Sequence, residues 1–247
     1  VQKIFYKLNL MEKAKKIKII LGIIYFLIVS IFLWYFFTNF SIDEVTSYEF
    51  IKKNRDLLSI FKEKNFFSII LAFLFMTVIW VLLLGFGSPI GLIGGFVFGK
   101  WTGTLIVSIS LTIGATILYI FANFFLKELI KEKFEEKFIN LIGKFKKNEF
   151  LYFFIYRFVG GIPFFIANIL PSLFSIKIKN YFFGTLFGII PSVFIFVSLG
   201  AGLQKIINEN IEAPSFFHLL SSQEIYIPIL GFLLLIIISF FIKKKLD

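Results

Sequence analysis

The chain has 247 residues, 58% of them hydrophobic, a formal net charge of +11 and no cysteine. A soluble domain of this length cannot cover so much apolar surface, so the composition excludes an ordinary soluble protein and indicates an integral membrane protein. The absence of cysteine excludes disulfides and thiol chemistry, and membrane topology with anionic lipid head groups explains the positive charge better than nucleic acid does.

The first element that we expect is a membrane-spanning helix at residues 19–37. This uncharged run follows six lysines and has the ~20 residues needed to cross a hydrocarbon core of ~30 Å. It is too long for the core of a signal peptide and lacks a small-residue cleavage site, so we expect a retained anchor followed by a loop in residues 1–65. A second simple span is expected at residues 225–242, within a C-terminal region of residues 204–247.

Two longer apolar blocks lie between these spans and share one internal order. In each block an apolar segment is broken by a Gly/Pro cluster, resumes, reaches a lysine and is followed by a full-length apolar span. The breaks are Gly85–Pro89 and Gly160–Pro163, and the spans are expected at residues 101–126 and 181–203. Glycine weakens a helix and proline removes a backbone donor, so each break predicts either a kinked span or a re-entrant hairpin.

The distribution of lysine and arginine favours re-entrant hairpins at residues 66–99 and 150–175. If all long segments crossed the membrane, 12 basic residues would lie inside and 13 outside. If each block instead enters and returns on one side, 18 lie inside and 7 outside, in keeping with the positive-inside rule. Both termini are then cytoplasmic. A full crossing by residues 66–86 is the alternative for the first block.

The expected fold is an all-α polytopic membrane protein. Its core, residues 66–203, is an inverted repeat of two re-entrant helical hairpins, each followed by a transmembrane helix, with further transmembrane helices on either side. The linker at residues 127–149 places apolar residues every three or four positions opposite lysine and glutamate. This pattern predicts a helix on the cytoplasmic membrane surface, or else a solvated helix packed on the protein.

Arg157 is the residue whose position most needs an explanation. It lies inside an apolar run, and no acidic residue occurs between Glu149 and Glu209. Burying an arginine costs ~2.5 to 3.5 kcal/mol on insertion scales, so its charge must be compensated. Three interpretations are open. The guanidinium snorkels or bonds backbone carbonyls freed at the break, or it faces a water-filled cavity and binds an anionic head group, or a loop glutamate pairs with it as a gate.

The neighbours of Arg157 favour a phosphate-sized site. Glycines at the break let a ligand approach the backbone, and a helix that starts at Pro163 would aim free N–H groups at the tip of the hairpin. Asn168 is expected at a similar depth, and the tip of the first hairpin can meet this one at the midplane. The candidate substrate-binding residues are Arg157, Gly160, Gly161, Pro163, Asn168, Ser88 and Pro89. Gly91, Gly95 and Gly99 have spacing typical of close helix packing.

The second block resembles the DedA superfamily, also called SNARE-associated Golgi or VTT-domain proteins. The matching residues are Arg157, Pro163-Phe164, Asn168, Tyr181–Thr185, Gly188, Pro191 and Leu199-Gly200, and in the first block Pro89, Phe98-Gly99, Gly103 and Gly114. The resemblance covers residues 66–203 and implies two facing hairpins and the movement of phospholipids or polyprenyl phosphates between leaflets. Proton-coupled bacterial members carry acidic residues in the first hairpin, and this sequence has none there. The Golgi-type branch is therefore more similar.

The sequence leaves little chemistry for an enzyme. His218 is the only histidine, no Walker motif occurs, and the apolar blocks hold no acidic pair, so we expect no metal site, cofactor or catalytic role. The function that we expect is a lipid scramblase or flippase for anionic phospholipid or polyprenyl phosphate, in a bacterial inner membrane. The alternatives are a small-solute or ion transporter using the same site, and a trafficking or structural protein. Membrane lipids are the expected partners, with a homo-oligomer left open.

Overall fold

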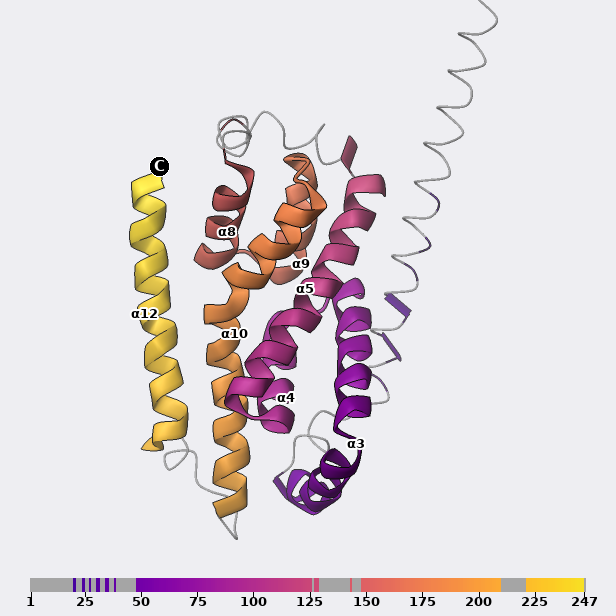
Figure 1. Ribbon diagram of the computed structural model, residues 1–247, viewed down its shortest axis with the longest axis vertical. Coiled ribbons are helices and arrows are strands. Elements are labelled where there is room, and N and C mark those ends of the chain that lie inside the picture. The colour runs from indigo at the N-terminus through magenta and orange to yellow at the C-terminus, as the bar shows by residue number, and fades with distance from the viewer. Residues whose placement is uncertain are drawn as a thin grey trace, which may run out of the picture.

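The computed structural model is α-helical throughout the part of the chain that it describes (Figure 1). That part comprises residues 20, 24, 27, 30, 31, 34, 35, 38, 48–125, 127, 128, 143, 148–209 and 221–246, without the side chains of 48–63 and 243–246. The helices are α3 (Tyr48–Leu82), α4 (Gly87–Phe98), α5 (Lys100–Phe125), α8 (Glu149–Val159), α9 (Phe164–Ile169), the 3₁₀ helix η2 (Leu170–Leu173), α10 (Ile178–Glu209) and α12 (Gln223–Leu246).

Four of the described helices contain a stretch long and apolar enough to cross a membrane. These stretches are Lys64–Leu82, Lys100–Phe125, Ile178–Glu209 and Gln223–Ile242. They confirm the spans predicted at residues 101–126, 181–203 and 225–242, and the protein is an integral membrane protein. The predicted anchor at residues 19–37 and the amphipathic linker at 127–149 fall almost entirely outside the described residues.

Helix α3 has two parts that the sequence separates by polarity. Asn65 interrupts it with non-helical backbone angles (φ −133°, ψ 35°), where a charged segment gives way to an uncharged apolar one. Figure 1 shows the bend that results at the lower end of α3. Only the part after the bend is apolar enough to enter a membrane.

The first hairpin consists of this apolar part of α3 and the antiparallel helix α4. Its tight turn is closed by the Trp80 indole N–H, which donates a hydrogen bond to the Phe86 carbonyl at 2.8 Å. Phe98, at the end of α4, packs edge-on against Phe73, with ring centroids 5.2 Å apart, and lies 6.3 Å from Phe66. The chain therefore returns to the level at which the apolar part of α3 began.

The second hairpin consists of α8 and the shorter arm formed by α9 and η2. The Asn148 side chain caps α8 by accepting a hydrogen bond from the Leu151 N–H at 3.1 Å, and Gly160 ends the helix at a φ of 62°, which glycine adopts without strain. At the open end, a Glu149 carboxylate oxygen accepts a hydrogen bond from the Lys177 N–H. The two ends of the hairpin are thus held together.

The returning arm of the second hairpin begins where the sequence indicates. Pro163 was expected within the first turn of a helix that would aim its free N–H groups at the tip. It is the N-cap residue of α9, and its carbonyl accepts a hydrogen bond from the Ala167 N–H at 2.9 Å. Helix α9 has only six residues and continues into a 3₁₀ turn, so few peptide dipoles are aligned there, and anion binding at its start stays a prediction.

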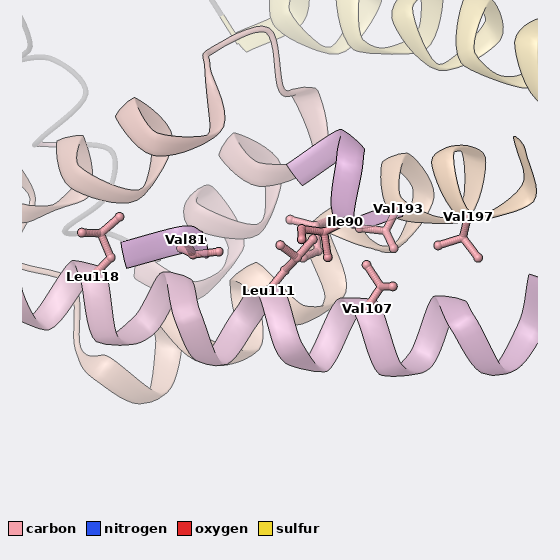
Figure 2. Close-up of a cluster of buried hydrophobic side chains, with 8 residues drawn as sticks. Val81, Ile90, Val107, Leu111, Leu118, Val193 and Val197 are labelled. Atoms are coloured by element: carbon pink, nitrogen blue, oxygen red, sulfur yellow. The ribbon is translucent and has the colours of Figure 1, made fainter. Parts of the chain in front are cut away.

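Helix α5 forms the centre of the molecule. Figure 2 shows its side chains pointing at residues of α3, α4 and α10 in one buried cluster. The cluster consists of Val81, Ile90, Val107, Leu111, Leu118, Ile189, Val193 and Val197. Because lipid tails are as apolar as these side chains, close packing rather than transfer from water holds such helices together.

Helices α4 and α10 cross with their backbones in contact. A Cβ added at Gly95 would collide with the carbonyl of Val197, and one added at Gly200 with the carbonyl of Leu92. Gly91 likewise packs against Phe196. The expected glycine packing is thus confirmed for Gly91 and Gly95. It is wrong for Gly99, which follows α4 with a positive φ and where an added Cβ would meet no atom within 4 Å.

Candidate functional site

Arg157 lies in the last turn of α8 and is only 5% exposed. Its Nε–H donates a hydrogen bond to Thr185 Oγ1 at 3.2 Å. Its Nη2 group donates to Asn168 Oδ1 at 2.7 Å and to the Tyr181 hydroxyl at 2.5 Å. All three acceptors are neutral and completely buried, so the positive charge is hydrogen-bonded without being neutralised by them.

Aromatic rings surround the guanidinium group. Its central carbon lies 5.2 Å from the ring centroids of Phe153 and Tyr181, and 6.0 Å from that of Phe164. Tyr181 stacks in turn on Tyr119, with centroids 4.1 Å apart, and the Tyr119 hydroxyl donates to the Ile176 carbonyl at 2.6 Å. Ring faces carry negative potential, so they add cation–π stabilisation and hold the guanidinium in one orientation.

Small residues on α10 bring Arg157 to this place. Tyr181, Thr185 and Gly188 follow at spacings of four and three and therefore share one helix face. A Cβ at Gly188 would fall 2.5 Å from the Arg157 Cβ, and one at Gly184 2.7 Å from the Phe153 ring. Only glycine lets α8 approach α10 so closely, and the approach places the guanidinium beside its acceptors.

One of the three interpretations of Arg157 does not fit this geometry. The guanidinium donates to side chains rather than to freed backbone carbonyls, and the residue is only 5% exposed. Within the described part of the chain no carboxylate pairs with it, since Glu149 accepts from the Lys177 backbone. Pairing with a loop glutamate stays a prediction, because Glu132, Glu135, Glu136 and Glu212 lie outside the described residues. The described residues fit the interpretation in which Arg157 faces a cavity.

A cavity of about 960 Å³ adjoins Arg157. Both hairpin tips, α5, α10 and α12 contribute to its wall, which is mainly apolar. The tips themselves meet at its edge: Phe86 packs edge-on against Phe165, with ring centroids 6.2 Å apart. The cavity thus lies where segments from three distant parts of the sequence come together.

Four of the seven predicted site residues line the cavity. They are Ser88, Arg157, Gly160 and Gly161. Asn168 is completely buried behind the wall and contacts Arg157. Pro163 is exposed outside the lining, and Pro89 lies half-buried within the first turn of α4. The role of all seven residues in substrate binding stays a prediction.

Further residues surround Arg157 that were not predicted as site residues from the sequence. Tyr181 and Thr185 accept its hydrogen bonds, and Ser192 and Ser239 are among the residues that line the cavity. The spacing of Tyr181, Thr185 and Gly188 was a signal for one shared face. No comparable signal marked Ser239, which lies in an otherwise uniformly apolar span.

The VTT domain family matches residues 86–202 of this chain. Residues 86–202 are a VTT domain. The resemblance to the DedA and SNARE-associated superfamily is thereby confirmed. The domain begins at the tip of the first hairpin and ends within α10, so the apolar part of α3 and the whole of α12 lie outside it.

Two relatives carry the same description, Transmembrane protein 41 homolog. The one from Dictyostelium discoideum is 27% identical over 167 residues, which cover 65% of this chain and 49% of the relative. The one from Caenorhabditis elegans is 25% identical over 197 residues, covering 74% of this chain and 79% of the relative. The chain therefore spans about half the length of the first relative. No solved structure matches the chain.

Proposed function

We propose that this VTT-domain protein is a lipid scramblase or flippase that moves anionic phospholipid, or a polyprenyl phosphate, between the leaflets of a membrane. The observation that carries the proposal is the position of Arg157. A buried guanidinium whose described hydrogen-bond acceptors are all neutral lines a large apolar cavity between two hairpin tips. A lipid phosphate supplies the negative charge that the described residues around Arg157 lack.

The chemistry of the wall suits a phosphorylated amphiphile. Guanidinium groups bind phosphate through paired, charge-assisted hydrogen bonds. The remaining wall is mostly apolar, and the volume of about 960 Å³ lies at the upper end of the ~300 to 1,000 Å³ found for small-molecule sites. Such a cavity accommodates a head group and its glycerol while the acyl chains stay in the bilayer.

The proposal includes the finer membrane topology. We propose that the two hairpins are re-entrant from opposite sides, as an inverted repeat with both termini cytoplasmic. In Figure 1 the first hairpin occupies the lower half of the bundle and the second the upper half, and their tips touch through Phe86 and Phe165. Two re-entrant hairpins whose tips meet leave a short path between the leaflets, in keeping with the charge distribution.

The membrane in which the protein resides stays outside this proposal. The relatives come from two eukaryotes, and they lend no support to the expected bacterial inner membrane.

Reconstitution tests the proposal. The purified full chain is placed in liposomes with fluorescent phosphatidylserine, and the loss of signal on adding a membrane-impermeant quencher reports movement between leaflets. Arg157→Met keeps much of the side-chain volume but removes the charge, so we expect scrambling to slow about tenfold or more, because a charge-assisted hydrogen bond contributes ~1.5 to 3 kcal/mol. Arg157→Lys should fall between the two, since it keeps charge without paired donors.

Arg55→Met is the matched control, because it removes the only other arginine of the chain. Equal scrambling by wild type and Arg157→Met would contradict the role of Arg157. Uptake of inorganic phosphate without lipid movement would indicate a solute transporter. Neither activity, together with a cellular role that survives Arg157→Met, would indicate a structural or trafficking protein.

A further inference from the structure

We infer that the tip of the second hairpin is a hydrated main-chain binding site in the middle of the membrane. The site consists of the N–H groups of Gly160, Gly161 and Ile162, which bind water at rest and the oxygen atoms of a lipid phosphate during its passage. The part of this inference that concerns the lipid rests on the proposed function, and the part that concerns water does not.

The main chain at this tip is both unpaired and uncovered. In the part of the chain that the structure describes, no hydrogen bond is donated by the N–H group of Gly160, Gly161 or Ile162. All three residues are exposed and line the cavity, and a Cβ added at either glycine would meet no atom within 4 Å. These donors therefore face open space rather than protein.

The tip of the first hairpin is different, because its main chain is satisfied internally. The N–H groups of residues 83–85 donate to the carbonyls of Ile79, Val81 and Trp80 at 2.9 to 3.0 Å. The unpaired donors of the second tip are thus a property of that tip and not of every turn in this protein.

The second tip lies at the depth of the middle of a spanning helix. Helices α8 and α10 run parallel, since Phe153 lies against Gly184 and Arg157 against Gly188. The tip begins three residues after Arg157 and so reaches the level of Ser192, which lines the same cavity. Ser192 is close to the midpoint of α10, a helix long and apolar enough to cross a membrane.

Unpaired N–H groups at this depth require water. Irregular main chain occurs inside a membrane only where protein buries it or where it lines a water-filled cavity, because hydrocarbon offers no hydrogen-bond acceptor. Protein does not bury this tip, so the adjoining cavity holds water. An apolar cavity without polar groups can stay dry, but here the three N–H groups give water the partners that it needs.

A phosphate oxygen accepts from the same N–H groups as water does. A head group that enters the cavity exchanges part of its hydration for main-chain donors, so it does not have to be transferred dry through hydrocarbon. The class of ligand is therefore a phosphate, either that of a lipid or the free ion, and the reagents used below separate the two sources.

Hydrogen–deuterium exchange tests the hydrated tip in the unmodified full chain. Exchange of an amide requires both water and the absence of a closed hydrogen bond. In lipid nanodiscs we expect the amides of residues 160–162 to exchange at least about tenfold faster than those of residues 83–85, which are hydrogen-bonded. Equal protection of the two tips, read by mass spectrometry of their peptides, would overturn the inference.

A thiol at the tip gives an independent test, because the chain has no cysteine. Ile162→Cys replaces a residue that is 38% exposed. The control is Leu234→Cys, which is 58% exposed and lies two residues from Phe232 and from Ile236, both part of the cavity lining, without lining it itself. Thiolate is the reacting form and is scarce in hydrocarbon, so a charged maleimide on both sides of liposomes should label Ile162→Cys about tenfold faster.

A lipid reagent separates this inference from the proposed function. In liposomes containing phosphatidylethanolamine with a maleimide on its head group, we expect Ile162→Cys to form a lipid adduct, detected by intact mass, and Leu234→Cys to form none. Labelling by the soluble maleimide without a lipid adduct would leave the hydrated site standing and contradict the proposed function. Equal labelling of the two variants by the soluble maleimide would overturn the inference. Should Ile162→Cys prove poorly folded by size-exclusion chromatography, the exchange experiment still decides.

Discussion

The two hairpins are similar in layout but differ in the chemistry of their interiors. The first is mainly apolar, apart from Thr77 and Ser88. It is closed at its turn by Trp80 and pressed by its glycines against the backbone of α10. The second carries Arg157 in a network of neutral acceptors. Its tip has two glycines with positive φ, Gly160 and Gly161, and a Cβ added at either one would meet no atom within 4 Å. The first is built for packing, and the second leaves room beside a charge. Substitutions in the first should therefore change stability, and substitutions in the second should change transport.

The largest effect is expected at the backbone contact of the first hairpin. In Gly95→Ala the new Cβ would collide with main-chain atoms of Val197, which cannot move aside as a side chain would. We expect the free energy of unfolding to fall by about 3 kcal/mol or more, measured by thermal unfolding in detergent. Gly143→Ala, where nothing lies within 4 Å, should leave stability unchanged or slightly higher. Equal melting temperatures would show that the two helices do not pack as described.

A smaller effect is expected from Tyr181→Phe in the second hairpin's network. The ring and its stacking stay, but Arg157 Nη2 loses one of its two acceptors, so stability should fall by about 2 kcal/mol and lipid movement should slow. Tyr119→Phe is the matched control. It removes the hydroxyl of the other ring in the stack, and that hydroxyl donates to the Ile176 carbonyl rather than contacting Arg157. It should lower stability without slowing transport. If both variants slow transport equally, the network does not act through Arg157.

The tip of the second hairpin gives the third test. Gly161→Ala places a Cβ on a residue whose φ is 78° but which has open space around it. The cost is then backbone strain alone, about 1 to 2 kcal/mol, seen as a lower melting temperature. Gly161→Asn should cost less, since asparagine tolerates this conformation better. Alanine and asparagine variants of equal stability would argue against a left-handed residue here.

The smallest effect is expected at the turn of the first hairpin. Trp80→Phe removes the hydrogen bond to the Phe86 carbonyl, a neutral interaction that contributes about 1 kcal/mol. Melting temperature should fall slightly, and scrambling should remain at the wild-type rate. A large loss of transport at unchanged stability would mean that the first hairpin also takes part in the chemistry, and the contrast between the two hairpins would fail.

Both breaks could be predicted from residue type because they have local causes. Glycine and proline interrupt a helix wherever they cluster, and the turns follow Leu82 and Val159 closely. No length was predicted for the helix that follows Pro163. Local sequence does not reveal that α9 gives way to a 3₁₀ turn after Ile169, where Leu170–Leu173 pack against the central helix α5.

The sequence by itself determined that this is a helical membrane protein, where three of its four described long apolar helices lie, and that a lone arginine sits in an apolar run without a nearby acid. These properties depend on composition and on neighbours within a few positions. Only the tertiary structure decided which groups hold that arginine, and that α12 brings Ser239 to the same cavity. Tyr181, Thr185 and Ser239 lie far from Arg157 along the chain, and such contacts arise from the crossing and register of packed helices, which short-range pattern does not encode.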